Sequence, residues 1–154
     1  MATVELRFSA QPEHVRTARL VAAAVARRSG VDEAVLDEVR LAVGEACSRA
    51  VGLHRSNGIV APVRVVLTEE EKAFSIEVGD EMPSTGEAAS AVPGVRSTSA
   101  GGDVEPSGDG EDEMGLAVIS GLVDDVEVMS SAAGGVIRMT WPTTLATTSA
   151  TVLP

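Results

Sequence analysis

Hydrophobic and polar positions alternate at the start of the chain and then recur with helical spacing. Residues 3–9 alternate apolar with polar side chains, which predicts a half-buried strand. From Pro12 the apolar residues recur every three or four positions until Gly30, which predicts a helix with proline in its first turn and glycine after its end. A second helical pattern begins after Asp32, a good N-cap residue, and runs to about Leu53.

The second half of the chain contains two pairs of strand-like runs with a short helix between them. The runs are 63–68 and 73–80, then a helix opened by Gly115 over 114–123, then 124–130 and 135–141. Each pair is joined by a short turn and therefore predicts a β-hairpin. Clustered helices and hairpins indicate an α+β fold, a two-layer sandwich with three helices on one face of a mainly antiparallel sheet.

The segment from residue 81 to residue 113 has no apolar period. It holds six Gly, three Pro and eight acidic residues against one basic residue, Arg96. Such a segment buries too little apolar surface to offset its ordering entropy. We therefore expect one domain over 1–142 that contains a disordered or lid-like insertion at 82–112, followed by a disordered tail at 143–154.

The amino-acid composition argues against several classes of function. The formal net charge is −11 and only 2% of residues are aromatic, which argues against direct binding of nucleic acid through its phosphates or bases. The single cysteine, Cys47, excludes an internal disulfide. No apolar stretch reaches membrane length. These features predict a cytoplasmic protein without a membrane segment.

The helix predicted over 32–53 carries the candidate chemistry. Glu45 and Arg49 are four residues apart and so lie on the same face, where they form either a surface salt bridge or part of a site. Gly44 inside the helix suggests the close approach of another element. We expect Cys47 to be a small buried packing residue and His54 to be a surface residue that interacts with the helix dipole.

Three short motifs resemble those of one family. They are Glu45-Ala46-Cys47-Ser48-Arg49-Ala50 in the long helix, Val78-Gly79-Asp80-Glu81-Met82-Pro83 at the end of a strand, and Glu113-Met114-Gly115-Leu116 at the last helix. In their order and in the elements that carry them, they resemble the anti-sigma regulatory factors and serine-protein kinases with a GHKL, or histidine-kinase-like, ATPase fold. The resemblance covers residues 3 to about 141.

The resemblance implies an ATP site. Glu45 matches the family's general base, Asp80 the carboxylate that binds the adenine amino group, and Gly115 with Leu116 the motif that approaches the phosphates. Arg49 stands where the family has its magnesium-binding asparagine. A guanidinium offers only donors and a positive charge, so it cannot ligate magnesium. Arg49 therefore either pairs with Glu45 and lowers its basicity or contacts the nucleotide phosphates directly, and no metal ligand is expected.

The resemblance also implies partners. Proteins of this kind sequester a sigma factor and release it to a STAS-domain anti-anti-sigma protein, with ATP bound and, in kinase members, a serine of the partner phosphorylated. The substituted Arg49 leaves open a switch that binds partners without phosphoryl transfer, and composition leaves open a sensing or scaffold domain. The sequence does not decide between a monomer and a homodimer.

Overall fold

The computed structural model describes residues 2–83, 95–97, 110–123 and 125–143, with side chains described outside 95–97 and 110–115. Its elements are β1 (Thr3–Phe8), α1 (Pro12–Ser29), the 3-10 turn η1 (Glu33–Val35), α2 (Leu36–Ser56), β2 (Val63–Glu69), β3 (Ala73–Asp80), β4 (Val95–Ser97), α3 (Gly110–Leu122), β5 (Asp125–Ser131) and β6 (Gly134–Pro142).

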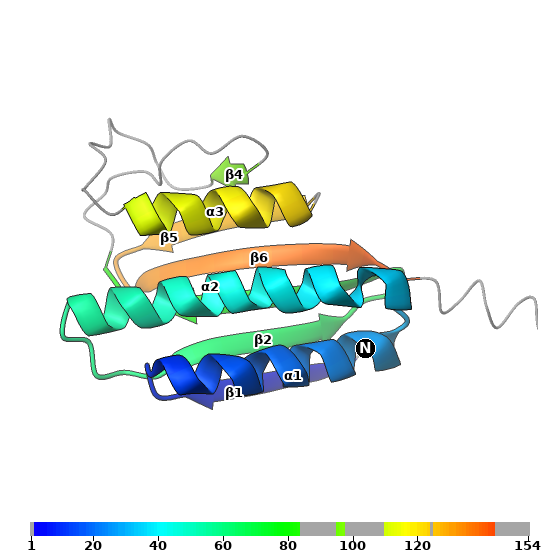
Figure 1. Ribbon diagram of the computed structural model, residues 1–154, viewed down its shortest axis with the longest axis horizontal. Helices are drawn as coiled ribbons and strands as arrows, with labels where there is room; N and C mark the ends of the chain where they lie inside the picture. The colour runs from blue at the N-terminus through cyan, green and yellow to red at the C-terminus, as the bar shows by residue number, and fades with distance from the viewer. Residues whose placement is uncertain (1, 84–94, 98–109, 124, 144–154) are drawn as a thin grey trace, which may run out of the picture.

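The strands form one sheet in the order β1-β2-β3-β6-β5-β4. Neighbouring strands are antiparallel except β4, which is parallel to β5. The three helices lie side by side on one face of the sheet, and the other face carries no helix among the described elements (Figure 1). This confirms the predicted α+β sandwich.

Local signals placed most element ends correctly. Asp32 caps the turn that leads into α2, because its carboxylate accepts a hydrogen bond from Ala34 N at 2.9 Å. Gly30 ends α1 with φ 100°, a left-handed conformation that glycine adopts without strain. Helix α2 continues to Ser56, slightly beyond the predicted end.

The core is aliphatic and lies between the helices and the sheet. Alanines line the contact between α1 and α2, where small side chains allow the helices to approach closely. Those that are essentially fully buried include Ala18, Ala22, Ala26, Ala42 and Ala46. Gly44 belongs to the same contact: a Cβ there would lie 3.0 Å from Arg19 Cδ, so the predicted close approach is made by the Arg19 side chain.

The acidic segment contains one short strand, and the helix that follows it starts earlier than expected. The short strand β4 lies within the insertion predicted at 82–112, because an edge strand is held by backbone hydrogen bonds that need no apolar period. Helix α3 begins at Gly110 and not at Gly115, and the acidic run at 111–113 suits the positive end of the helix dipole. Residues 84–94 and 98–109 of the insertion, and residues 144–154 of the tail, lie outside the described residues.

Candidate functional site

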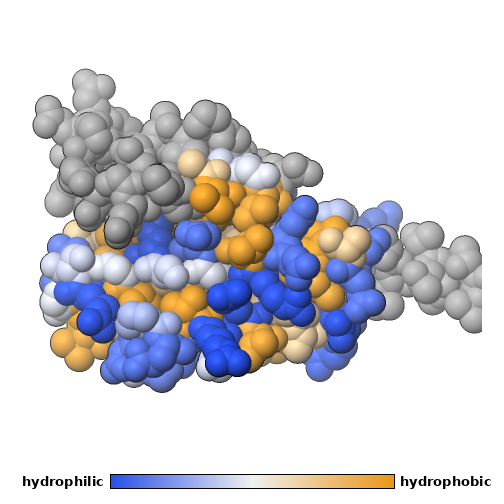
Figure 2. Space-filling model, in the orientation of Figure 1, coloured by the Kyte–Doolittle hydropathy of each residue, from blue (hydrophilic) through white to orange (hydrophobic). Residues whose placement is uncertain are grey.

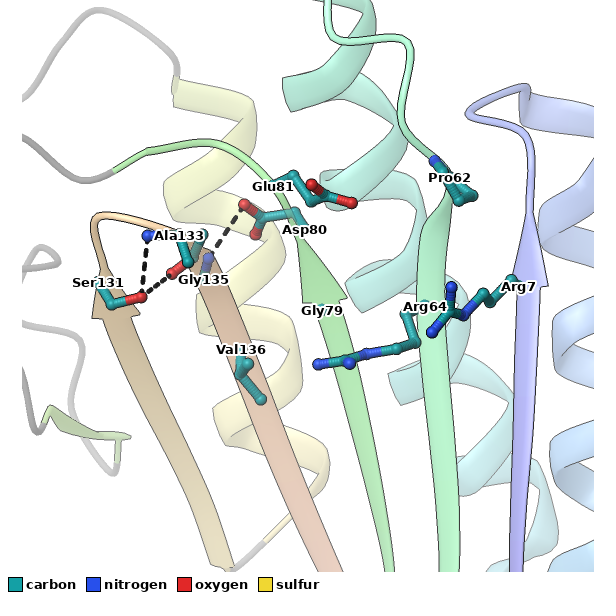
Figure 3. Close-up of a pocket in the computed structure, with 11 residues that line it drawn as sticks. Arg7, Pro62, Arg64, Gly79, Asp80, Glu81, Ser131, Ala133, Gly135 and Val136 are labelled. Atoms are coloured by element: carbon teal, nitrogen blue, oxygen red, sulfur yellow. Dashed lines mark hydrogen bonds between the residues drawn. The ribbon is translucent and has the colours of Figure 1, made fainter.

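Asp80 ends β3 on the side of the sheet that the helices cover. Its side chain is only 5% exposed. The carboxylate oxygen Oδ1 accepts a hydrogen bond from the backbone N–H of Met82 at 2.8 Å. It accepts a second one from the backbone N–H of Gly135 at 3.3 Å (Figure 3). These two bonds satisfy one oxygen and leave Oδ2 directed elsewhere. A buried carboxylate with one oxygen left to accept is suited to a donor group of a ligand or of the protein.

The glycines at the start of β6 make room for Asp80. A Cβ on Gly134 would lie 2.0 Å from the Asp80 carbonyl oxygen, and the φ of this glycine is +147°. A Cβ on Gly135 would lie 3.0 Å from Asp80 Oδ2. The sequence gives no signal for this role, because it depends on a strand 54 residues before Gly134.

Arg49 approaches Asp80 from α2. Its Nη1 lies 3.8 Å from Asp80 Oδ2, beyond hydrogen-bond length but within the range of an ion pair, and its side chain is 18% exposed. Its Nε is buried and has no hydrogen-bond partner among the described residues. The expected pair between Arg49 and Glu45 is absent from the described part of the chain, because the long arginine side chain reaches across to β3.

Glu45 lies where α2 borders α1. It is half-buried and lines a shallow cavity of about 130 Å³ between the two helices, together with Arg19, Gly44 and Ser48. Within the described residues, no hydrogen bond or ion pair joins Glu45 to Asp80. Its assignment as a general base stays a prediction.

His54 was wrongly predicted to lie on the surface. It is fully buried at the end of α2. Its Nδ1 lies 2.8 Å from the Ala61 carbonyl oxygen, and its Nε2 accepts a hydrogen bond from the backbone N–H of Glu81 at 2.8 Å. Because Nε2 accepts, the proton of the neutral ring sits on Nδ1 and is donated to Ala61. His54 thereby holds the chain just after Asp80 against α2, a long-range contact that helical spacing cannot reveal.

The predicted phosphate-side residues lie on α3. Gly115 sits inside this helix, in its second turn, and Leu116 is 2% exposed and packs in the hydrophobic core. Helix α3 packs against α2. Leu116 therefore has a packing role, and contact of either residue with a nucleotide stays a prediction.

Cys47 is fully buried, as expected for a packing residue. Burial raises the pKa of its thiol from 9.0 to about 12, since a thiolate would lose its hydration there. The thiol is therefore protonated and unreactive at neutral pH. This excludes Cys47 as a nucleophile of the site in the folded protein.

An adenine base and a magnesium ion fit this site differently. Asp80 Oδ2 can accept from an amino group, so the carboxylate fits an adenine once the Arg49 guanidinium moves aside. Magnesium prefers several oxygen ligands, and Arg49 has none to offer. Moreover, the described residues contain no group of three or more His, Cys, Asp or Glu side chains that could hold a metal ion.

Comparisons with known proteins agree with this fold. Residues 8–141 match the family model of the histidine kinase-like ATPase domain. The chain belongs to this family, which confirms the GHKL fold expected from its motifs.

A crystal structure of the RsbU and RsbW domains of Rv1364c from Mycobacterium tuberculosis is similar, with a TM-score of 0.60 and 16% sequence identity over 91% of this chain and 32% of that one. The chain thus spans about a third of the length of that protein. A comparison with curated proteins gives no match. In the described part of this chain, no helix is both long and apolar enough to cross a membrane.

Proposed function

We propose that this chain is a partner-switching regulator of the anti-sigma type, which binds a sigma factor and is countered by a STAS-domain protein. Support comes from its membership of the histidine kinase-like ATPase family, from the resemblance of its three motifs to anti-sigma regulatory factors, and from a fold shared with a structure that contains an RsbW domain. The cytoplasm, where sigma factors act, is the compartment that this function requires.

The outer faces of α1 and α2 are our candidate partner surface. Leu20 on α1 is 57% exposed and Leu41 on α2 is 50% exposed, although both are large apolar residues. The helix face also shows apolar groups between polar ones (Figure 2). Burying an exposed leucine against a partner removes its apolar surface from water, which favours formation of the complex.

The contact between Arg49 and Asp80 decides whether we expect a kinase or a switch that transfers no phosphoryl group. Asp80 is the group that would receive the adenine, and Arg49 stands where a kinase of this family needs its metal-binding asparagine. Phosphoryl transfer depends on metal ions to neutralise the developing charge. We infer that the chain binds adenine nucleotide weakly, without a metal ion, and transfers no phosphoryl group to its partner.

A reconstitution experiment tests this function. The purified chain is mixed with a candidate sigma factor or STAS protein, with labelled ATP and magnesium, and run on a sizing column. We expect a stable complex and no label on the STAS protein. Label transfer would contradict the switch and support the kinase.

Two surface variants locate the partner surface. Leu20→Ser and Leu41→Ser should weaken the complex without lowering the melting temperature, since both side chains are exposed in the free chain. Val60→Ser is a matched control, because Val60 is 95% exposed in the loop after α2. Equal loss of binding in all three variants would show that the α1–α2 face is not the contact.

A further inference from the structure

The open face of the sheet carries two arginines directly opposite each other. Arg7 on β1 pairs in register with Arg64 on β2, and Arg64 pairs in turn with Gly79 on β3. Like charges in directly opposed positions of an antiparallel pair repel. Arg7 also contacts Glu5 at 2.6 Å, whereas Arg64 has no ion-pair partner among the described residues. Glu5 therefore offsets the charge of Arg7, whereas the charge of Arg64 is left without a carboxylate partner in the described part of a chain whose net charge is −11.

A pocket lies over Gly79, beside the two arginines. Position 79 has no side chain, so the Arg64 guanidinium can lie over it, next to Val136, which pairs with Gly79 from β6. The pocket has a volume of about 340 Å³, and the turn from Ser131 to Gly135 forms its wall on the β6 side. Figure 3 shows the Arg7 and Arg64 side chains extending from their strands in the same direction, with Arg64 lying across Gly79.

Asp80 lines the edge of this pocket, but the two arginines and Arg49 lie on opposite faces of the sheet. The Arg7, Arg64 and Gly79 positions face the side of the sheet without helices, whereas Arg49 reaches Asp80 from α2 on the covered side. The lining has two acidic residues: the exposed Glu81, and the buried Asp80, whose Oδ1 is already hydrogen-bonded to backbone N–H groups. In Figure 3 the Glu81 carboxylate lies toward Pro62, away from the Arg64 guanidinium. The Arg64 guanidinium, which lies over Gly79, therefore has no carboxylate partner in the described part of the pocket.

We propose that this pocket binds a small oxyanion, a phosphate or carboxylate group of a metabolite, between Arg7 and Arg64. A guanidinium binds such groups with two parallel N–H donors, and a bound anion would turn the repulsion between the two arginines into a shared attraction. The volume is at the lower end of the range for small-molecule sites. The site adjoins the proposed adenine-binding residue, since Asp80 lines both, but it uses two arginines on the open face and does not depend on the proposed function.

The test follows the backbone amide signals of Gly79, Gly134 and Gly135 in nuclear magnetic resonance spectra. Inorganic phosphate and malonate are titrated separately into the full chain, with sodium chloride adjusted to hold the ionic strength constant. We expect saturable shifts at these glycines with at least one anion. A response to phosphate alone assigns a phosphate group, and a response to malonate alone assigns a carboxylate. Shifts that stay linear with both anions overturn the proposal.

Variants then assign the binding to the two arginines. Arg7→Gln and Arg64→Gln should each weaken binding by about tenfold or more, because each removes a charged two-donor contact. Arg16→Gln on α1 removes the same charge from an exposed position on the helix side and should leave the affinity unchanged. Equal weakening in Arg16→Gln, or unchanged binding in Arg64→Gln, overturns the proposal.

A third variant tests the shape of the pocket without changing its charge. In Gly79→Ala the added Cβ would lie 3.7 Å from Arg64 Nε, an ordinary contact distance, so the chain should fold normally. The methyl group would occupy the floor of the pocket. We expect weaker anion binding by several-fold with an unchanged melting temperature, and full binding in this variant would contradict the proposed location.

Discussion

Replacing Arg49 by asparagine restores the residue type that the family uses for magnesium and removes the cation beside Asp80. In the structure Arg49 Nη1 lies 3.8 Å from Asp80 Oδ2, and both side chains are largely buried. If the guanidinium competes with the adenine amino group for this oxygen, Arg49→Asn should bind ATP and ADP more tightly. The same variant should lose stability in the absence of nucleotide.

The geometry limits the size of both effects. Two unit charges 3.8 Å apart attract by about 4 kcal/mol at an effective dielectric constant of about 20. Desolvation of both groups offsets much of this attraction, and Asp80 Oδ1 keeps its two backbone donors. We therefore expect the free energy of unfolding to fall by about 2 kcal/mol, which lowers the melting temperature by about 4–8 °C in a domain of this size.

Calorimetric titration of ATP and ADP, with magnesium and with a chelator, measures the competition. Relief of about 1.4 kcal/mol of competition corresponds to a tenfold gain in affinity. We expect this gain in Arg49→Asn and a dependence on magnesium that the wild type lacks. Arg55→Asn, at an exposed position near the end of the same helix, is the control. Weaker nucleotide binding by Arg49→Asn than by the wild type would refute the competition and show that Arg49 is itself a ligand contact.

Three further predictions concern buried positions. His54→Ala should lower the free energy of unfolding by about 3 kcal/mol, because it leaves two backbone groups without partners and creates a cavity. In chemical denaturation, the control His14→Ala, at a half-buried position, should cost less than about 1 kcal/mol. Similar losses in the two variants would be inconsistent with the two hydrogen bonds of His54. Cys47 should react with a thiol reagent at pH 8 only when the chain unfolds, and rapid labelling of the native protein would rule out its burial. The free energy of unfolding should fall as the pH rises from about 9 to about 12, because the buried thiol keeps its proton while the thiol of the unfolded chain loses it. Gly134→Ala should destabilise the fold by more than about 3 kcal/mol, because its Cβ would overlap backbone atoms of β3. In thermal melts, the control Gly52→Ala in α2, where nothing lies within 4 Å of the added Cβ, should stabilise the fold by about 0.5–1 kcal/mol. A tolerated alanine at position 134 would argue against the close packing of β6 on β3.

The order of elements followed from the sequence because its signals are local. Alternation, helical spacing and the residues at element ends, such as Pro12, Gly30 and Asp32, act within a few positions and do not depend on distant parts of the chain. They therefore predicted the helices, the hairpins and the two-layer sandwich. The three motifs also indicated the family correctly, because each is a short run of neighbouring residues within or at the end of one element.

The arrangement of the site depended on the tertiary structure. The sequence placed Glu45 and Arg49 on one helix face, but the register of β3 and the packing of α2 on it put Asp80 within reach of Arg49 instead. The buried role of His54 and the need for glycine at position 134 arise in the same way, from contacts between residues 27 or more positions apart. Such contacts are set by packing the whole core, and no local spacing encodes them.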